Sequence, residues 1–246
     1  MRWVILFNFT IIFGLLLLLA ISTQWSYPNL LPNIHASAKG TFKLLDRILL
    51  KSIYQSLLLS ITLASLATIF GFFASRYAVR FSRLALLPFL IAPIILMASL
   101  RYFFITIGLN NTWGGVLIGQ FFLAYPFAFI FLHPFWSNKW EEMMMTSQEL
   151  GANLFHTFTT IIGPNARPVL TLCFFHTFLI SWFDYGTALI IGAGQVKTLT
   201  VLVYQYVQEA NIFLAARASV IIGIPALLLL LINKHYILGK IPFYGS

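Results

Sequence analysis

Long apolar runs separated by short polar stretches make up most of this chain. A helix needs about 20 mostly apolar residues to cross the hydrocarbon core of a bilayer. Six windows along the sequence meet that requirement, at residues 3–21, 54–75, 84–107, 114–136, 169–191 and 213–233. We therefore predict an all-α membrane protein with about six transmembrane helices.

The first apolar window lies where a secretory signal peptide would lie. Its apolar run is long, however, and no small-x-small cleavage site follows it, so we expect a retained membrane anchor. The chain then divides into an N-terminal helix with an extracytoplasmic loop, residues 1–48, and a five-helix core, residues 49–246.

Composition points to the same class of protein. Hydrophobic residues make up 60% of the chain and charged residues only 9%, whereas a soluble domain carries about 25% charged residues. This difference excludes a soluble enzyme. The formal net charge is +9, from 15 Lys and Arg against 6 Asp and Glu. In a membrane protein an excess of Lys and Arg is typical of the cytoplasmic loops. The positive charge therefore does not indicate nucleic acid, and we expect membrane lipid as a partner.

The distribution of basic residues between the loops predicts the orientation, because short cytoplasmic loops are enriched in Lys and Arg. With a cytoplasmic N-terminus, eight basic residues fall on the cytoplasmic side: Arg2, Arg76, Arg80, Arg83, Lys139, Arg167, Lys234 and Lys240. Five fall on the other side: Lys39, Lys43, Arg47, Lys51 and Lys197. The modest bias favours a cytoplasmic N-terminus.

Two of the predicted loops are long enough to carry structure of their own. Residues 137–168 form a polar connection that is cytoplasmic in this orientation, and we expect a partner protein to bind there. Residues 192–212 are extracytoplasmic and contain an apolar-aromatic stretch at 199–207. Its apolar side chains share one face at helical spacing, which predicts a short helix at the membrane interface.

The loop at 137–168 contains the most informative motif. Gly151 is followed by nine residues, then by Ile161, and Pro164 comes three positions later. This spacing resembles the cytoplasmic signature of permease subunits of ATP-binding-cassette importers: Glu-Ala-Ala, three residues, Gly, nine residues, Ile, one residue, Leu-Pro. The chain departs from that pattern at Met145, where the family has glutamate, and at Gly163, where it has leucine.

Other segments between about residues 50 and 235 are similar to the same family. Asn111-Thr-Trp-Gly-Gly115 resembles a segment that precedes the helix before the signature loop, and Tyr125-Pro126 loosely resembles a Leu-Pro pair within that helix. The stretch 181–186 looks like the subgroup that imports polyamines, ferric iron or thiamine.

The resemblance implies a type I importer permease (MetI-like) fold with a cytoplasmic coupling helix in the bacterial inner membrane. It implies cytoplasmic ATPase subunits, a second permease subunit and an extracytoplasmic substrate-binding protein as partners. Gly151 would make a tight turn, and Pro164 would stop the following helix. The candidate coupling residues are Met145, Glu149, Leu150, Gly151, Ala152, Ile161 and Pro164.

Few residues suggest chemistry of their own. The pattern Gly-x4-Gly-Lys-Ser/Thr is absent, so any ATP must bind another polypeptide, and we expect no catalytic residue and no cofactor. Cys173 and His176 are three positions apart and would share a helix face, but they lack the further ligands of a metal site. Asp184 lies within an apolar window, where an ionisable group usually faces a cavity or a partner. It is a candidate for the substrate path, or for a pair with Arg101 or Arg217.

The favoured interpretation is therefore a permease subunit driven by a separate ATPase. The alternative is an ATP-independent secondary transporter or channel, for which Asp184 would be the one candidate coupling group. A membrane enzyme or assembly factor would need a polar cluster that the sequence does not suggest. The substrate, and whether two identical or two different permease chains pair, stay open.

Overall fold

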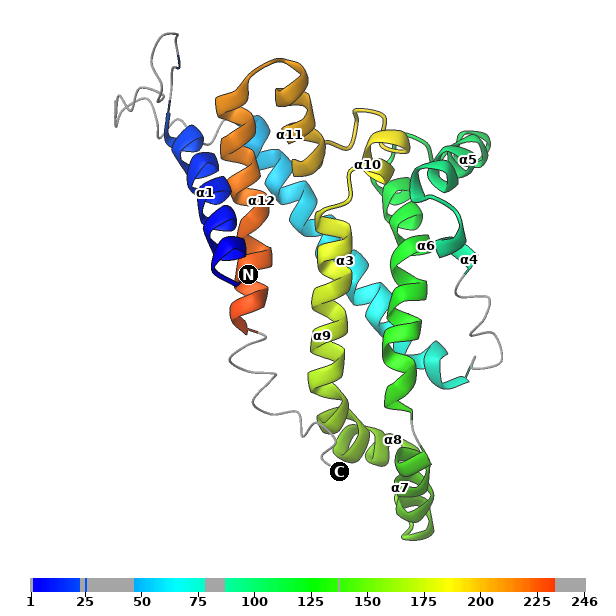
Figure 1. Ribbon diagram of the computed structural model, residues 1–246. Helices are drawn as coiled ribbons and strands as arrows, with labels where there is room; N and C mark the ends of the chain where they lie inside the picture. Colours follow the sequence, from blue (N-terminus) through cyan, green and yellow to red (C-terminus); the bar gives the residue numbers. More distant parts are fainter. Residues whose placement is uncertain (1, 23–24, 26–46, 78–86, 137, 233–246) are drawn as a thin grey trace.

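The computed structural model describes residues 2–22, 25, 47–77, 87–136 and 138–232 (Figure 1). This part of the chain is helical and contains no strand, which confirms the predicted all-α class. The α-helices are α1 (Arg2–Ile21), α3 (Arg47–Tyr77), α4 (Leu87–Leu90), α5 (Pro93–Thr106), α6 (Trp113–Leu132), α7 (Asn138–Glu149), α8 (Leu154–Thr157), α9 (Gly163–Trp182), α10 (Gly186–Ile190), α11 (Leu199–Gln208) and α12 (Ile212–Ile232). A 3₁₀ turn (His133–Phe135) follows α6, and a π-helical turn (Phe158–Ile162) joins α8 to α9.

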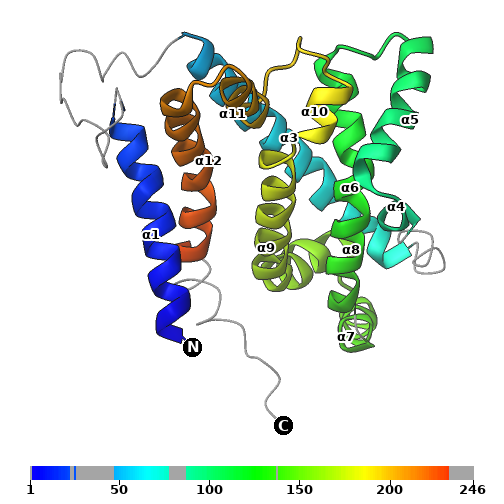
Figure 2. The same ribbon diagram turned by 45° about the horizontal axis from the view of Figure 1, so that its top comes forward.

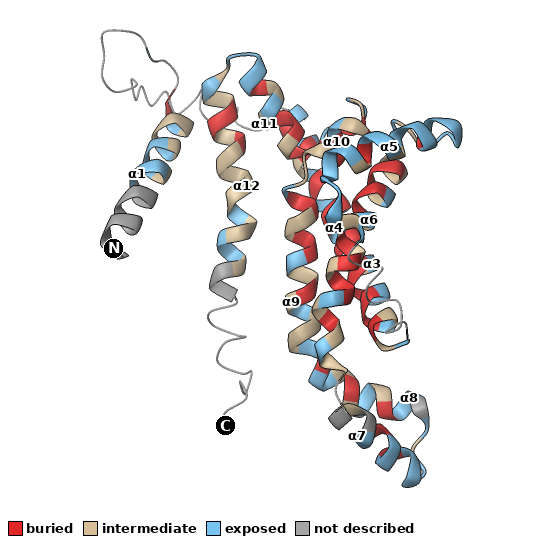
Figure 3. Cartoon of the chain, turned by 45° about the vertical axis from the view of Figure 1, so that its right-hand side comes forward, coloured by how far each residue is buried: buried red, intermediate tan, exposed pale blue. Residues whose placement is uncertain are grey.

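The core forms where α3 packs against both α6 and α9. One side of α3 carries small buried residues about every fourth position: Ser52, Ser56, Ser60, Ala64, Ala67, Gly71 and Ser75. Small side chains let membrane helices approach closely. An added Cβ at Gly71 would lie only 2.8 Å from Ala128 Cβ on α6. Buried positions accordingly concentrate where α3, α6 and α9 meet (Figure 3).

A second unit of the fold is the pair of α1 and α12, which lie side by side (Figures 1 and 2). Arg217 on α12 donates from Nε to the Ala20 carbonyl at 2.9 Å and from an η nitrogen to the Ser22 carbonyl at 3.2 Å. These carbonyls belong to the end of α1, where helix hydrogen bonding leaves acceptors free and a cation is favourable. Arg217 therefore fixes the end of α1 to α12.

Within the described residues, three helical segments are long and apolar enough to cross a membrane: Arg47–Tyr77, Trp113–Phe135 and Ile212–Leu229. They confirm a membrane-spanning helical protein. The count of six spans and the division at residue 48 stay predictions. The basic residues Lys39, Lys43, Arg80, Arg83, Lys234 and Lys240 lie outside the described residues, so the orientation inferred from them also stays a prediction.

The window predicted as one helix at 84–107 is instead interrupted. Residues 84–86 lie outside the described part, and α4 ends at Leu90 before α5 begins at Pro93. Proline disfavours the helical conformation of the residue before it, and Ala92 is non-helical, with φ −56° and ψ 129°. A single helix over this window is therefore wrong.

The window predicted at 169–191 is displaced and also interrupted. Helix α9 begins six residues earlier, at Gly163, and ends at Trp182, after which the chain turns and α10 begins at Gly186. The predicted short helix at 199–207 is confirmed as α11. Its face with Leu199 and Leu202 is buried against the protein, because α11 packs on α3 and α12.

Candidate functional site

The segment with the signature motif folds into a compact helical elbow, defined here as residues 138–162. It comprises α7, a turn at 150–153, α8 and the π-helical turn that leads into α9. In Figure 1 the elbow projects from the lower end of the bundle, beyond the ends of α6 and α9. Its outer side is largely exposed (Figure 3).

Gly151 makes the sharp turn of the elbow. It has a positive φ of 85°, a conformation that costs other residues about 1–2 kcal/mol. Its N–H donates to the Gln148 carbonyl at 2.9 Å, and the Ala152 N–H donates to the Ser147 carbonyl at 3.0 Å. Together these bonds form a Schellman motif, which satisfies the last carbonyls of α7. Nothing lies within 4 Å of a Cβ built on Gly151, so only its backbone conformation requires glycine.

A buried hydrogen bond joins the two arms of the elbow. The hydroxyls of Ser147 on α7 and Thr157 on α8 are 2.8 Å apart, and both residues are buried. Met144 on the inner side of α7 and Ile162 in the π-helical turn belong to the same hydrophobic cluster as the α3–α6–α9 core. The elbow is therefore packed onto the bundle and not a loose connector.

Pro164 does not stop a helix, contrary to the sequence prediction. It lies in the first turn of α9, and the helical path continues through it to Trp182. Proline removes a backbone donor and crowds the carbonyl four positions back. The preceding π-helical turn accommodates this, with the Gly163 N–H donating to the Phe158 carbonyl. Ile161, the predicted motif position, is only half-buried, whereas its neighbour Ile162 is fully buried.

The outer side of the elbow exposes large apolar side chains. The exposed fractions are 62% for Met145, 83% for Leu150 and 76% for Phe155. Glu142 and Glu149 are exposed on the same segment. A groove of about 560 Å³ runs between the arms and is lined by Glu142, Met143, Thr146, Ser147, Leu150, Ala152, His156, Thr160 and Ile161. Exposed apolar groups beside charges are typical of a protein-docking surface.

Asp184 lies between the end of α9 and the start of α10, away from the elbow. Its Oδ2 accepts from Gln120 Nε2 at 2.9 Å and from the Ala188 N–H at 3.3 Å, and its Oδ1 accepts from Thr187 Oγ1 at 3.1 Å. The Ser181 hydroxyl donates to Gln120 Oε1 at 2.7 Å. The carboxylate thus caps α10 and connects it to α6 and α9 through neutral donors.

The Asp184 network extends to α11, because the Thr200 hydroxyl donates to the Asp184 carbonyl at 2.8 Å. The alternative of a pair between Asp184 and Arg217 is wrong, since Arg217 binds the end of α1. Arg101 on α5 is exposed. The sequence did not single out Gln120, although a buried amide within an apolar helix is the kind of signal that marks such a network.

Cys173 and His176 both lie on α9, three positions apart, but their surroundings differ. Cys173 is buried in the core, whereas His176 is exposed and donates from Nδ1 to the Leu172 carbonyl at 2.8 Å. The His176 ring lies 6.1 Å from that of Phe127 and 5.6 Å from that of Phe131. Among the described residues, no three His, Cys, Asp or Glu side chains are grouped as a metal site would require.

No protein-family model matches the chain, but several known proteins are similar to it. It is 25% identical over 163 residues to the Fe(3+)-transport system permease protein FbpB 2 of Haemophilus influenzae, covering 64% of this chain and 32% of that protein. It is 28% identical over 123 residues to the probable sulfate transport system permease protein cysT of Prototheca wickerhamii, covering 48% of each. It is also 28% identical over 110 residues to the thiamine transport system permease protein ThiP of Brucella abortus, covering 45% of this chain and 20% of that protein.

The resemblance to importer permeases is confirmed. All three relatives are permease proteins of transport systems, and the chain has helices able to span a membrane. The matched part amounts to between a fifth and about half of the length of each relative. The chain is therefore a permease homologue, and this relation supports a transport role.

Proposed function

We propose that this permease homologue is the transmembrane subunit of an ATP-binding-cassette importer, which moves a small solute inward with energy from separate ATPase subunits. The observation that carries the proposal is the elbow. It is packed onto the bundle, yet it exposes Met145, Leu150 and Phe155 beyond the ends of the membrane helices. An exposed apolar surface of this kind is suited to binding a partner protein. Movement of the bound partner would be transmitted to the bundle through the elbow.

Each motif residue has a part in this proposal. Met145 and Leu150 supply apolar docking surface, and Glu149 supplies a charge for a basic group of the ATPase. Gly151 and Ala152 form the turn that holds the two arms together. Ile161 and Pro164 belong to the continuous helical path into α9, so that a displacement of the elbow moves α9 as a rigid body.

The proposal places the elbow in the cytoplasm of a bacterial cell, with the chain in the inner membrane and its N-terminus cytoplasmic. Two permease chains, identical or different, would form the pathway, and an extracytoplasmic binding protein would deliver the solute. Asp184 would lie at the outer end of this pathway. Its network joins α6, α9, α10 and α11, so it is suited to hold the outer end of the path in one conformation.

The test is whether an ATPase subunit co-purifies with the full chain from native membranes in a mild detergent. We expect recovery of the ATPase to fall strongly for Leu150→Asp, because Leu150 is 83% exposed and the change introduces a charge without disturbing the fold. Gly151→Ala strains the turn by about 1–2 kcal/mol and should also reduce recovery.

Gly108→Ala is the matched control for Gly151→Ala. Gly108 has a φ of 72°, also has no atom within 4 Å of an added Cβ, and its N–H also donates three positions back, to Ile105. It lies in the turn between α5 and α6, away from the elbow. Equal loss of the ATPase in both glycine variants would refute a specific role of the elbow. Absence of any ATPase with the unchanged chain, in several mild detergents, would favour an ATP-independent transporter or channel.

A further inference from the structure

A small basic pocket lies at the end of α3 opposite the elbow. It has a volume of about 270 Å³ and is formed by the first turns of α3 and the turn before α11. Its lining residues are Ile48, Lys51, Ser52, Gln55, Gly194, Gln195 and Lys197. Pockets for drug-sized molecules are commonly about 300–1,000 Å³, so this one suits a single headgroup better than a whole solute.

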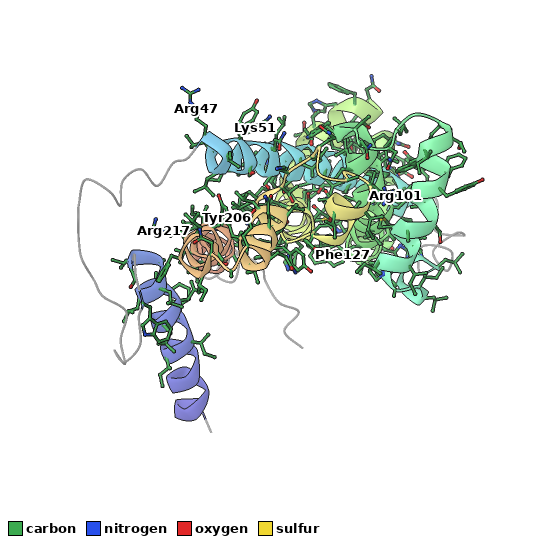
Figure 4. All side chains as sticks on the ribbon, turned by 90° about the horizontal axis from the view of Figure 1, so that it is seen from above. Arg47, Lys51, Arg101, Phe127, Tyr206 and Arg217 are labelled. Atoms are coloured by element: carbon green, nitrogen blue, oxygen red, sulfur yellow. The ribbon has the colours of Figure 1, made fainter. Side chains whose placement is uncertain are left out.

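The charge of the basic pocket has one sign. Lys51 on α3 and Lys197 before α11 line it from separate elements, and no Asp or Glu is among the described lining residues. Arg47 stands one turn before Lys51, on the same side of α3 (Figure 4). Like charges repel when they converge, and a bound anion would turn this repulsion into attraction.

The pocket also offers a polar group without a described partner. The Oε1 atom of Gln55 is buried and has no hydrogen-bond partner among the described residues. The two terminal atoms of an amide exchange places by a rotation of 180°, so Gln55 can present its NH₂ group as a donor. Ser52 supplies a hydroxyl beside it. A tetrahedral oxyanion has enough acceptor oxygens to bind these donors and both lysines.

The surroundings of the pocket indicate which anion it takes. The pocket opens at the start of Arg47–Tyr77, one of the helices able to span a membrane, so it lies near the level of the lipid headgroups. Large apolar side chains are exposed beside and below it, with exposed fractions of 58% for Ile48, 66% for Tyr54 and 41% for Leu58. Basic groups next to lipid-facing apolar surface are typical of binding sites for acidic phospholipids.

We propose that the basic pocket binds the phosphate group of an anionic phospholipid, with Lys51 and Lys197 as its cationic contacts and the acyl chains along the exposed side of α3. This site is separate from the elbow and does not depend on which protein drives transport. A free phosphate ion would use the same donors but not the apolar surface, so the two sources of phosphate can be separated by experiment.

The test is lipid binding to the purified full chain, measured by native mass spectrometry during titration with phosphatidylglycerol and, separately, phosphatidylcholine. We expect phosphatidylglycerol to bind at least tenfold more tightly. The double variant Lys51→Gln, Lys197→Gln should lose this preference. Arg101→Gln is the control, because Arg101 is an exposed cation on α5, across the molecule from Lys51 (Figure 4). It should bind within twofold of the unchanged chain.

Several outcomes would overturn the proposal. They are equal binding of the two lipids, unchanged phosphatidylglycerol binding by the double variant, or equal losses in the double variant and Arg101→Gln. The source of the phosphate is tested by repeating the titration with millimolar inorganic phosphate. Complete displacement of the lipid by inorganic phosphate would reassign the pocket to a free anion, whereas retention of the lipid supports the headgroup. Gel filtration and circular dichroism of each variant confirm that it is folded.

Discussion

The crossing of α3 and α6 at Gly71 allows a sharp prediction about stability. A Cβ added at Gly71 would lie 2.8 Å from Ala128 Cβ, 3.1 Å from Ala128 C and 3.2 Å from Phe129 N, whereas ordinary contacts are 3.4–4 Å. Two of these three neighbours are backbone atoms, which cannot move aside by a change of rotamer. The helices must therefore separate to accept even one methyl group.

The expected cost of Gly71→Ala is about 1–3 kcal/mol, the range for overpacking a close-packed interior. A destabilisation of 1 kcal/mol lowers Tm by about 2–4 °C for a soluble chain of 150–250 residues, so we expect Tm in detergent to fall by several degrees. Gly223→Ala is the matched control. It makes the same change inside α12, where nothing lies within 4 Å of the added Cβ, and it should leave Tm unchanged or slightly higher.

A second change tests the cause of the Gly71→Ala effect. Ala128→Gly removes the atom nearest to the new methyl group, so the double variant Gly71→Ala, Ala128→Gly should recover part of the lost Tm beyond the sum of the single effects. Thermal unfolding followed by tryptophan fluorescence gives the Tm of the unchanged chain and of the four variants. The reasoning is refuted if Gly71→Ala and Gly223→Ala behave alike, or if the two changes at the crossing are simply additive.

Two further predictions concern polar contacts away from the elbow. Arg217→Gln should loosen α1 from α12 at a cost of about 1–3 kcal/mol. We expect faster hydrogen exchange in the last turn of α1, with little change in α3. Equal exchange rates for the last turn of α1 in the variant and in the unchanged chain would contradict this prediction. Asp184→Asn should lower Tm, because the new NH₂ group must face one of the donors that now bind the carboxylate. The decrease should exceed that of the control Gln205→Ala, which removes an exposed hydrogen bond of α11. An unchanged Tm for Asp184→Asn would show that the network is not stabilising.

Features that depend on local conformation agree between sequence and structure. A glycine after a polar helix predicts a turn, and Gly151 makes one, because positive φ is a property of the residue itself. The helix at 199–207 is found for a similar reason, since its apolar side chains repeat with helical spacing. The break before Pro93 also has a local cause, which is the effect of proline on the preceding residue. Hydropathy does not reveal this break, because residues 84–107 form one apolar window.

Features that depend on distant contacts could not be predicted in the same way. Proline ordinarily ends a helix, yet Pro164 lies within a continuous helical path because a π-helical turn precedes it. That turn contains Ile162, which is fully buried in the cluster with Ala67 and Ala128. The outcome at Pro164 therefore depends on how three other helices pack, and no spacing rule within the loop contains that information.

By itself, the sequence determined the class of this protein, its relation to importer permeases and the place of its elbow, because hydropathy, glycine turns and motif spacing are short-range properties of the chain. Only the tertiary structure decided that Asp184 binds Gln120, 64 positions away, that Arg217 fixes α1, and that Lys51 and Lys197 line one pocket. Each of these contacts joins separate segments of the chain. Which segments become neighbours depends on how well their whole buried faces fit together. Those faces are complementary only after the chain has folded, which is why residue types alone do not reveal the partners.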